Sequence, residues 1–399
     1  MLKNNLIKIN GFIGNGVHSK VKKKNLDLGL IYSKKSIIAS GVFTKNKSKA
    51  APVILSESKI NNEIHGVIIN SGNANAATGK KGFENSKKIC GILAKDLNIK
   101  PKNILTCSTG IIGKQLEMKK ITQGLKKVTQ NLSYKNFNLV AEAIKTTDTF
   151  TKTNSIKFNI NKNIIKINGL AKGSGMIHPN MATMLGFITT NVNIKKDILD
   201  DLLKELTDKT FNMISVDGDT STNDTVLVLC NKSANNPIIK NKKDKNYKIF
   251  KEKLYIILKD LAIKIAKDGE GATKLLTVNI ENAFKEKEAK KMAKAVVSSN
   301  LVKSAFYGQN TNWGRILSSL GSVNAKIDME KIDISFKGNS KEIILMEKGK
   351  PKKYNLKTSQ DIMEKDSIEI KINLNIGKYN STAWGCDLSE EYVKINAAY

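Results

Sequence analysis

The sequence predicts an α/β fold, and three observations support this prediction. Short segments in which apolar and polar residues alternate recur along the chain, and this period of two is typical of β-strands. Between them lie longer segments with apolar residues at helical spacing. The composition, with 40% hydrophobic and 26% charged residues, is that of an ordinary globular protein. A chain of 399 residues is long enough for two or three structural units with cores of their own.

The first third of the chain alternates predicted strands with predicted helices. The expected strands are Leu28–Tyr32, Ser36–Phe43, Gly66–Asn70 and a short buried strand that begins at Ile104. The expected helices are Phe83–Leu97 and Phe137–Lys145. The first of these helices ends before Pro101, because proline lacks the backbone N–H that a helix needs.

The same alternation continues through the rest of the chain. The expected strands are Ile156–Ile160, Ile164–Ile167, Met184–Ile188 and Thr225–Cys230. The expected helices are Asp197–Asn212, Phe250–Ala266, Glu286–Val297 and Arg315–Leu320. From Ser322 to Asp387 only short β segments are expected.

The net charge of +31 raises nucleic-acid binding as an alternative function. The lysines are nevertheless spread along the whole chain, and denser runs occur only at Lys20–Lys24 and Lys240–Lys245. Arg315 is the single arginine, whereas arginine is the preferred reader of guanine edges and phosphates. Aromatic residues make up only 6% and do not interleave with basic ones. We therefore expect small anionic molecules as partners, not nucleic acids.

The sequence also predicts the cellular setting. No apolar run approaches the length needed to cross a bilayer, and the amino terminus lacks the apolar block of a secretion signal. A cytoplasmic location is expected. The cysteines Cys90, Cys107, Cys230 and Cys386 are widely spaced and form no C-x-x-C pair. Neither a zinc site nor a disulfide framework is predicted, and the thiols are expected to be reduced and buried.

The segment from Lys172 to Leu185 carries the most distinctive chemistry. It places Thr183 after the small residue Ala182, in a stretch with almost no charge. The Thr183 hydroxyl can attack the Ala182 carbonyl and cut the chain, and the new α-amine can then act as the general base for the same hydroxyl. On local chemistry alone, a threonine that merely opens the following strand is the commoner case. His178, which lies nearby, is interpreted as an oriented loop histidine.

Three other loops admit more than one interpretation. Ile104–Gly113 ends in a glycine-containing turn, which can stabilise an oxyanion through its N–H groups or can simply be a tight turn. The carboxylates of Asp217, Asp219 and Asp224 lack the rest of a calcium-loop pattern, so a loop that hydrogen-bonds to itself is expected. Lys267–Lys274 lacks the Gly-Lys-Ser/Thr tripeptide of a phosphate loop.

Several motifs together resemble the ornithine acetyltransferase family of arginine biosynthesis, whose members are also called glutamate N-acetyltransferases. The self-cleavage motif of that family is similar to Lys172–Leu185. The other matching segments, in order, are Ile69–Ala76, Ser108–Gly113, Thr146–Thr149, Ser215–Thr225, Asp268–Lys274, Asn312–Ile316 and Ala383–Asn396. One such motif would be weak evidence, but collinear matches over nearly the whole chain favour the family strongly.

The resemblance implies a precursor that processes itself. The cut falls between Ala182 and Thr183 and gives an α chain of residues 1–182 and a β chain of residues 183–399. The two chains are expected to stay together as a dimer of αβ pairs, an α2β2 heterotetramer. The implied fold is a layered α/β sandwich with β-sheets between helical layers, similar to other self-cleaving enzymes of the aminopeptidase-like group.

The implied reaction is ping-pong acyl transfer from N2-acetyl-L-ornithine to L-glutamate. Thr183 is the nucleophile and becomes acetylated, and its α-amine carries the proton to the leaving ornithine amine. Thr109 and Gly110 match the oxyanion residues of the family. No metal or organic cofactor is implied, and the sequence leaves open whether acetyl-CoA also serves as an acetyl donor.

Further substrate contacts follow from the resemblance. Lys172 matches a family lysine near the nucleophile, where a cation can pair with a substrate carboxylate and keep the α-amine neutral. Glu270 matches a glutamate suited to the cationic side chain of ornithine. Thr146 or Thr147 is expected to hold a polar group of the substrate, and Asn396 is a further substrate contact.

The sequence departs from the family pattern in two places. Ala398 stands where an aspartate is usual, and the terminal serine or threonine contact is absent. Asn310-Thr311 replaces an Asp-Pro-like pair. Both changes leave the nucleophile intact and concern the edge of the pocket. The alternative functions are an amidase or aminopeptidase with the same type of nucleophile, in which water is the acceptor, and a basic nucleic-acid-binding protein.

Overall fold

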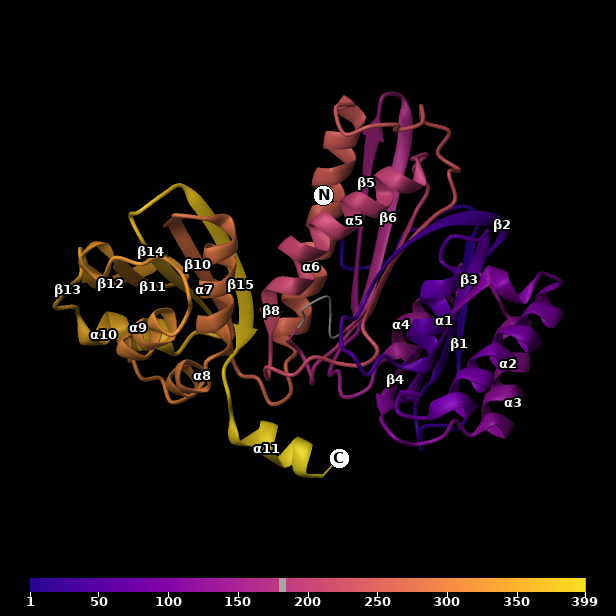
Figure 1. Ribbon diagram of the computed structural model, residues 1–399, viewed down its shortest axis with the longest axis horizontal. Coiled ribbons are helices and arrows are strands. Elements are labelled where there is room, and N and C mark those ends of the chain that lie inside the picture. The colour runs from indigo at the N-terminus through magenta and orange to yellow at the C-terminus, as the bar shows by residue number, and fades with distance from the viewer. Residues whose placement is uncertain (179–183, 399) are drawn as a thin grey trace. The chain divides into compact units, whose positions relative to one another are not determined.

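The computed structural model describes residues 1–178 and 184–398, and this part of the chain forms two β-sheets and eleven α-helices (Figure 1). The prediction of an α/β fold is therefore confirmed. The chain divides into two compact units, each built on one of the sheets. The first unit contains Met1–Gly173, 184–212 and Thr220–Leu261. The second contains Ser174–His178, Met213–Asp219 and 262–398.

The sheet of the first unit has eight strands. Their order is β4-β3-β2-β9-β7-β6-β5, and β1 pairs with β2. The strands are β1 (Phe12–Val17), β2 (Leu28–Phe43), β3 (Ile64–Asn73), β4 (Ile104–Ile111), β5 (Lys152–Ile160), β6 (Asn163–Lys172), β7 (Leu185–Thr190) and β9 (Thr225–Cys230). The pairs β3–β4 and β7–β9 are parallel, and the other pairs are antiparallel.

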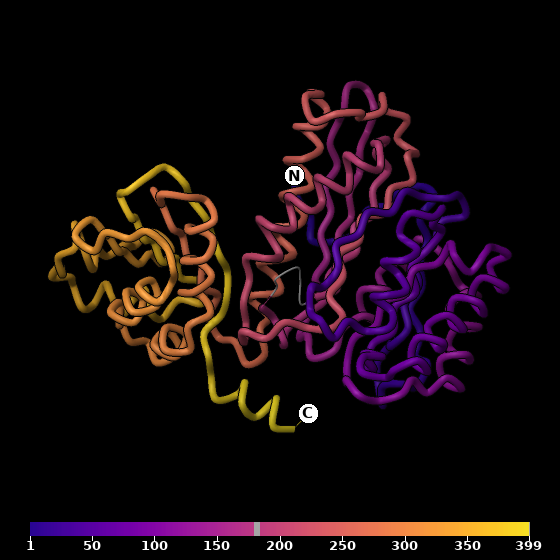
Figure 2. The backbone as a smooth tube through the Cα atoms, viewed as in Figure 1, coloured from indigo at the N-terminus to yellow at the C-terminus, as the bar shows by residue number. Residues whose placement is uncertain are grey.

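β2 is a single strand where the sequence predicts two. Its first half pairs with β1 and β3, and its second half pairs with β9. The register with β3 shifts between Tyr32 and Ile37, where three exposed polar residues interrupt the apolar alternation. This interruption explains why the sequence indicates two strands, although the backbone runs on without a turn (Figure 2). The prediction of separate strands at Leu28–Tyr32 and Ser36–Phe43 is wrong.

Helices cover both faces of strands β1 to β4. The helices of this unit are α1 (Ala51–Lys59), α2 (Gly79–Leu97), α3 (Met118–Gln130), α4 (Phe137–Ile144), α5 (Lys196–Lys209) and the first part of α6 (Lys245–Lys267). α2 and α3 run side by side (Figures 1 and 2) and share one core with Leu30. α4 shares the opposite core with Ile31, because successive strand residues point to opposite faces. This part of the first unit therefore has the layered arrangement that the resemblance implied.

The second unit is built on a seven-stranded sheet of order β13-β12-β11-β14-β10-β15-β8. The strands are β8 (Ile214–Ser215), β10 (Leu275–Ala283), β11 (Asp333–Gly338), β12 (Lys341–Glu347), β13 (Lys350–Pro351), β14 (Ser367–Asn373) and β15 (Tyr379–Cys386). The helices are α7 (Glu286–Ser298), α8 (Asn300–Tyr307), α9 (Gly314–Gly321), α10 (Leu356–Met363) and α11 (Glu390–Ala397). α7 packs along β10 and β15, and α10 packs on β11 and β12.

Of the helices in the described part of the chain, α1, α3, α8, α10 and α11 were not predicted, and two of these show why. α10 lies in the region for which only β segments were expected, so that prediction is wrong. This helix begins after Asn355, whose side chain accepts the Thr358 N–H, and only three of its eight residues are apolar, so no helical period is visible. α3 was not predicted, although Ile121, Leu125 and Val128 have helical spacing and are fully buried.

The four cysteines are buried and carry free thiols, as predicted. Burial raises the pKa of Cys107 to about 12, which keeps its thiol protonated. Among residues 1–178 and 184–398, no helix is both long enough and apolar enough to cross a bilayer.

Candidate active site

The predicted oxyanion residues Thr109 and Gly110 lie near the end of β4, beside the end of β3. Gly110 has a φ of +131°, which side chains with a Cβ rarely adopt. A Cβ at this position would overlap the carbonyl carbon of Gly72 on β3. Only glycine therefore allows the two backbones to approach this closely, and the Thr109–Gly110 peptide is held in one conformation.

Buried side chains also hold this end of β4, the predicted oxyanion turn, in place. Ser108 Oγ donates a hydrogen bond to Asn70 Oδ1 at 2.5 Å. Asn223 Nδ2 donates to the carbonyl oxygens of Ser108 at 2.8 Å and Ala74 at 2.6 Å. The sequence analysis assigned no individual role to Asn70 or Asn223, although both lie in segments that resemble the family. This network shows that three of these segments meet within the first unit.

Lys172, the last residue of β6, points toward the oxyanion turn. Its side chain is buried, with 7% of the residue exposed, and its Nζ donates to Thr109 Oγ1 at 3.3 Å. Leu185, the first residue of β7, pairs with Lys172 in the sheet register. The structure thus brings together two residues, Lys172 and Thr109, that the sequence analysis proposed from separate motifs.

Asp148 is a buried carboxylate that connects Lys172 to the predicted substrate contact. It accepts hydrogen bonds from Lys152 Nζ at 2.6 Å, Gly173 N–H at 2.7 Å and Thr146 N–H at 2.9 Å. Burial opposes the charged form, but the ammonium groups of Lys172 and Lys152 outweigh it and lower the pKa of Asp148. Asp148 is therefore charged at neutral pH. Asp148 was not predicted from the sequence, where the only signal is one carboxylate in a run of threonines.

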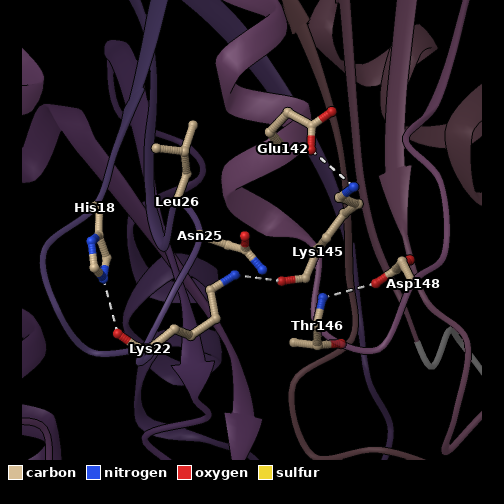
Figure 3. A pocket seen from close by; sticks show the side chains of 8 residues that line it. All are labelled: His18, Lys22, Asn25, Leu26, Glu142, Lys145, Thr146 and Asp148. Atoms are coloured by element: carbon tan, nitrogen blue, oxygen red, sulfur yellow. Dashed lines mark hydrogen bonds and ion pairs between the residues drawn. The ribbon is translucent and has the colours of Figure 1, made fainter.

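A cavity of about 440 Å³ opens beside Thr146 in the first unit (Figure 3). It is lined by His18, Lys22, Asn25, Leu26, Glu142, Lys145, Thr146 and Asp148. Thr147, the other residue of the predicted doublet, is not among these lining residues. The cavity therefore favours Thr146 as the residue of the doublet that faces a ligand.

In the second unit, Glu270 and Asn396 lie together although 126 residues separate them. Asn396 Nδ2 donates to Glu270 Oε2 at 2.9 Å. Glu270 N–H donates to the carbonyl oxygen of Ser174 at 2.9 Å. A Cβ on Gly175 would overlap the Glu270 carboxylate, so the glycine lets this carboxylate lie directly against the backbone. These contacts bring the two predicted substrate residues of this unit to the segment that precedes the proposed cleavage site.

Asp217 also binds the segment that precedes the proposed cleavage site. Its carboxylate accepts N–H groups of Met176 at 2.6 Å, Ile177 at 2.8 Å and Asp219 at 3.2 Å. Burial raises the pKa of Asp217 in spite of these donors. Burial and the carboxylate of Asp217 also raise the pKa of Tyr392, so this phenol stays protonated. The loop hydrogen-bonds to itself, as predicted, and it also anchors residues 176–177, which was not predicted.

His178 is held by two serine hydroxyls. Its Nδ1 lies 3.0 Å from Ser215 Oγ and 3.3 Å from Ser298 Oγ. Burial, and to a lesser degree the positive charge of Lys294, lower the pKa of His178 to about 4. His178 is therefore an oriented, neutral loop histidine at pH 7, as expected. Within the described part of the chain, no three His, Cys, Asp or Glu residues are grouped so as to hold a metal ion.

The predicted nucleophile Thr183 and its neighbour Ala182 lie outside the described residues. The remaining predicted contacts fall into two groups. Thr109, Gly110, Lys172 and Thr146 belong to the first unit, and Glu270 and Asn396 belong to the second.

Comparisons with known proteins agree over nearly the whole chain. The ArgJ family profile matches residues 14–399. An arginine biosynthesis bifunctional protein ArgJ from Clostridium acetobutylicum is 46% identical over 386 residues, which cover 96% of this chain and 94% of that protein. Its counterpart from Caldanaerobacter subterraneus is 44% identical over 390 residues, with 98% and 96% covered.

One solved structure is also similar. It is the crystal structure of arginine biosynthesis bifunctional protein argJ from Bacillus halodurans, with a TM-score of 0.51 and 40% sequence identity. The match covers 98% of that chain but 53% of this one, so the solved chain is about half as long.

Proposed function

The chain belongs to the ArgJ family of arginine biosynthesis, and from this premise we propose that it transfers the acetyl group of N2-acetyl-L-ornithine to L-glutamate through an acetyl group on Thr183. The products are L-ornithine and N-acetyl-L-glutamate. The proposal rests on one observation in the first unit. Leu185, two residues beyond the proposed nucleophile, pairs with Lys172, and the ammonium group of Lys172 reaches Thr109 in the oxyanion turn.

In the first half of the reaction, Thr183 Oγ attacks the acetyl carbonyl carbon of acetylornithine. The α-amine of Thr183 accepts the hydroxyl proton, and the carbonyl oxygen becomes an oxyanion. Donors at Thr109 and Gly110 stabilise this charge, and well-aimed donors of this kind contribute roughly 3–4 kcal/mol. The C–N bond then breaks, the α-amine returns its proton to the leaving nitrogen, and ornithine departs.

In the second half, the amine of glutamate attacks the acetyl-threonine ester. The same oxyanion forms again, and it collapses with release of the Thr183 hydroxyl and N-acetylglutamate. Lys172 has two roles in this scheme. Its charge favours the neutral α-amine of Thr183, and it pairs with the α-carboxylate that both substrates carry. The buried carboxylate of Asp148 lies close enough for the charge of Lys172 to lower its pKa, so the two opposite charges stabilise each other.

In the second unit, Glu270 is suited to the cationic side chain of ornithine. Its carboxylate accepts a hydrogen bond from the neutral amide of Asn396, and a carboxylate is the group that pairs with an ammonium. Asn396 orients the carboxylate and serves as a further substrate contact. Ala398 follows on the same short stretch and provides no carboxylate of its own.

We also propose that Thr183 cuts the chain before it catalyses acetyl transfer. The solved relative, which is about half as long as this chain, supports a break near the middle. The sheet explains how the pieces stay together. β7 and β9 of the proposed β chain lie between β2 and β6 of the proposed α chain, so hydrogen-bonded ladders join them on both sides. The α2β2 assembly and the cytoplasmic location stay predictions.

The relatives are called bifunctional, and this favours a second reaction. We propose that acetyl-CoA can also acetylate Thr183, with CoA thiolate as the leaving group. Glutamate would then accept the acetyl group by the same second half-reaction.

Ornithine release from acetylornithine, measured with and without glutamate, tests the function. The account predicts release that depends on glutamate, together with an equal amount of N-acetylglutamate. Equal ornithine release without glutamate would instead indicate an amidase that transfers the acetyl group to water. Replacing acetylornithine by acetyl-CoA in the same assay tests the second donor.

A further inference from the structure

Lys22 lies in a loop that is clamped in place beside the cavity of the first unit. The fully buried carboxylate of Asp27 accepts the N–H groups of Ser19 at 2.6 Å, Val21 at 2.9 Å and Lys22 at 3.0 Å. His18 Nε2 lies 2.9 Å from the carbonyl oxygen of Lys22 (Figure 3). The backbone of Lys22 is therefore fixed, and only its side chain has freedom to respond to a ligand.

The side chain of Lys22 crosses toward Thr146. A Cβ on Gly72 would lie 2.8 Å from Lys22 Cγ, so the stem of Lys22 packs directly on the strand end that supports Gly110. Its Nζ donates to the carbonyl oxygen of Lys145 at 3.0 Å, next to Thr146 (Figure 3). An ammonium group has three donors, and a carbonyl is a neutral acceptor.

In the described residues, no carboxylate lies within ion-pair distance of Lys22 Nζ, and Asp27 and Asp148 attract its charge only from farther away. Burial lowers the pKa of this half-buried lysine. A half-buried ammonium without a carboxylate partner is unfavourable unless something else supplies the negative charge. A half-buried ammonium group of this kind is what an anion-binding site needs.

The other charges of the cavity already have partners. Glu142 Oε2 lies 2.9 Å from Lys145 Nζ. Asp148 is held by Lys152 and by two backbone N–H groups. Lys22 is therefore the charged group that is left to recognise a ligand in this cavity, whose size suits an amino-acid side chain.

We propose that Lys22 binds the side-chain carboxylate of glutamate and so selects the acetyl acceptor. This assignment rests on the proposed function. Lys172 contacts the oxyanion turn itself, which suits the α-carboxylate, because that group is only two bonds from the reacting nitrogen. The side-chain carboxylate of glutamate is four bonds from the same nitrogen. Lys22 packs against the end of β3, the neighbour of the strand β4 that carries Thr109, and it lies beside Thr146. This position suits a carboxylate at the end of the longer glutamate side chain.

The proposal predicts that the two halves of the reaction respond differently to a change at Lys22. Exchange of labelled ornithine into acetylornithine uses the acetyl-threonine intermediate but no glutamate. Transfer to glutamate needs the side-chain carboxylate subsite. We expect Lys22→Met to lower kcat/KM for glutamate by roughly tenfold to a hundredfold, the range for loss of a hydrogen bond to a charged group. Ornithine exchange should fall far less.

Two further variants complete the experiment. Lys22→Arg keeps the charge and should retain most of the glutamate transfer. Lys23→Met removes an exposed lysine from the same loop and should leave both rates as in the unmodified enzyme. The exchange reaction also reports whether each variant is folded, because it needs the intact active site.

The outcomes separate this assignment from the proposed function. Equal losses of exchange and glutamate transfer in Lys22→Met would overturn the assignment alone, since Lys22 would then serve a group common to both substrates. Unchanged glutamate transfer would overturn it as well. If the unmodified enzyme fails to exchange ornithine, the acetyl-threonine mechanism itself is wrong, and the assignment falls with it.

Discussion

At Gly110 the backbone leaves no room for a side chain. The φ of +131° and the overlap of any Cβ with Gly72 both oppose substitution. Gly110→Ala should shift the Thr109–Gly110 peptide away from the developing oxyanion. We expect kcat to fall by about a hundredfold or more, which is the usual effect of losing one oxyanion donor. Steady-state kinetics with acetylornithine and glutamate measure this change.

Gly91→Ala is the matched control. Gly91 lies in α2, and a Cβ there would have no neighbour within 4 Å. Alanine favours a helix over glycine by about 1 kcal/mol, so this variant should keep full activity and gain slightly in stability. Wild-type kcat in Gly110→Ala would contradict the role assigned to the turn.

We expect Asp148 to stabilise the folded protein by an amount that depends on pH. Asp148→Asn leaves the fully buried Lys152 without its carboxylate partner, and breaking a buried pair of this kind costs about 3–5 kcal/mol. The native pKa of Asp148 is lowered below the unfolded value of about 3.9, so its contribution is fully present above that pH. It is lost as the pH falls from there through the native pKa. Urea unfolding of both proteins at pH 7 and at decreasing acidic pH measures the difference.

The control for this prediction is Asp201→Asn. Asp201 pairs with Lys242 at 2.8 Å, but both side chains are more than half exposed. An exposed pair of this kind contributes little to stability, so the variant should unfold nearly as the wild type does. If the difference in unfolding free energy between wild type and Asp148→Asn does not shrink on acidification, Asp148 does not stabilise the fold through its negative charge.

At the scale of elements, the central feature is the position of β7 and β9 between β2 and β6. A cut after Ala182 would separate these strands covalently from their neighbours but would leave their hydrogen bonds intact. We expect the fragments 1–182 and 183–399 to migrate as one species in size-exclusion chromatography and to separate only in denaturant. Fragments that dissociate under native conditions would show that the sheet is not shared in this way.

Many strands and most of the long helices were predictable because their signals are local, although α3 was missed. β3 to β7 and β9, like α2, α4, α5 and α6, show apolar periods of two or 3.6 residues in segments long enough to read. β2 was misread because polar residues interrupt its pattern at a register shift. α10 was missed because only three of its eight residues are apolar, and its amino-terminal cap lies in a lysine-rich stretch.

The site was predictable only in part, for a related reason. The resemblance supplied Thr109, Lys172 and Glu270 one by one, but sequence order says nothing of the contact between Lys172 and Thr109. Asp148 and Lys22 escaped notice because their importance lies in what surrounds them. A buried carboxylate with several donors and a half-buried lysine without a carboxylate are properties of packing, which a single sequence does not display.

At the scale of the whole molecule, the predicted contacts divide between two units. The first unit carries the predicted oxyanion residues, Lys172 and the cavity with Lys22, and the second carries Glu270 and Asn396. Each unit has its own sheet and its own pairing order. The boundaries of the proposed α and β chains do not follow this division, because the first unit takes strands from both sides of residue 182. Self-cleavage would therefore release an amino terminus without dividing the sheet of the first unit.

The central claim is that Thr183 becomes an amino terminus and then acts as the nucleophile. Intact mass spectrometry of active protein under denaturing conditions tests it most directly. We expect two masses, those of residues 1–182 and 183–399, with Thr183 first in the second chain. Thr183→Ala should give one mass and no acetyl transfer. A single unbroken chain of 399 residues with full activity would contradict the account.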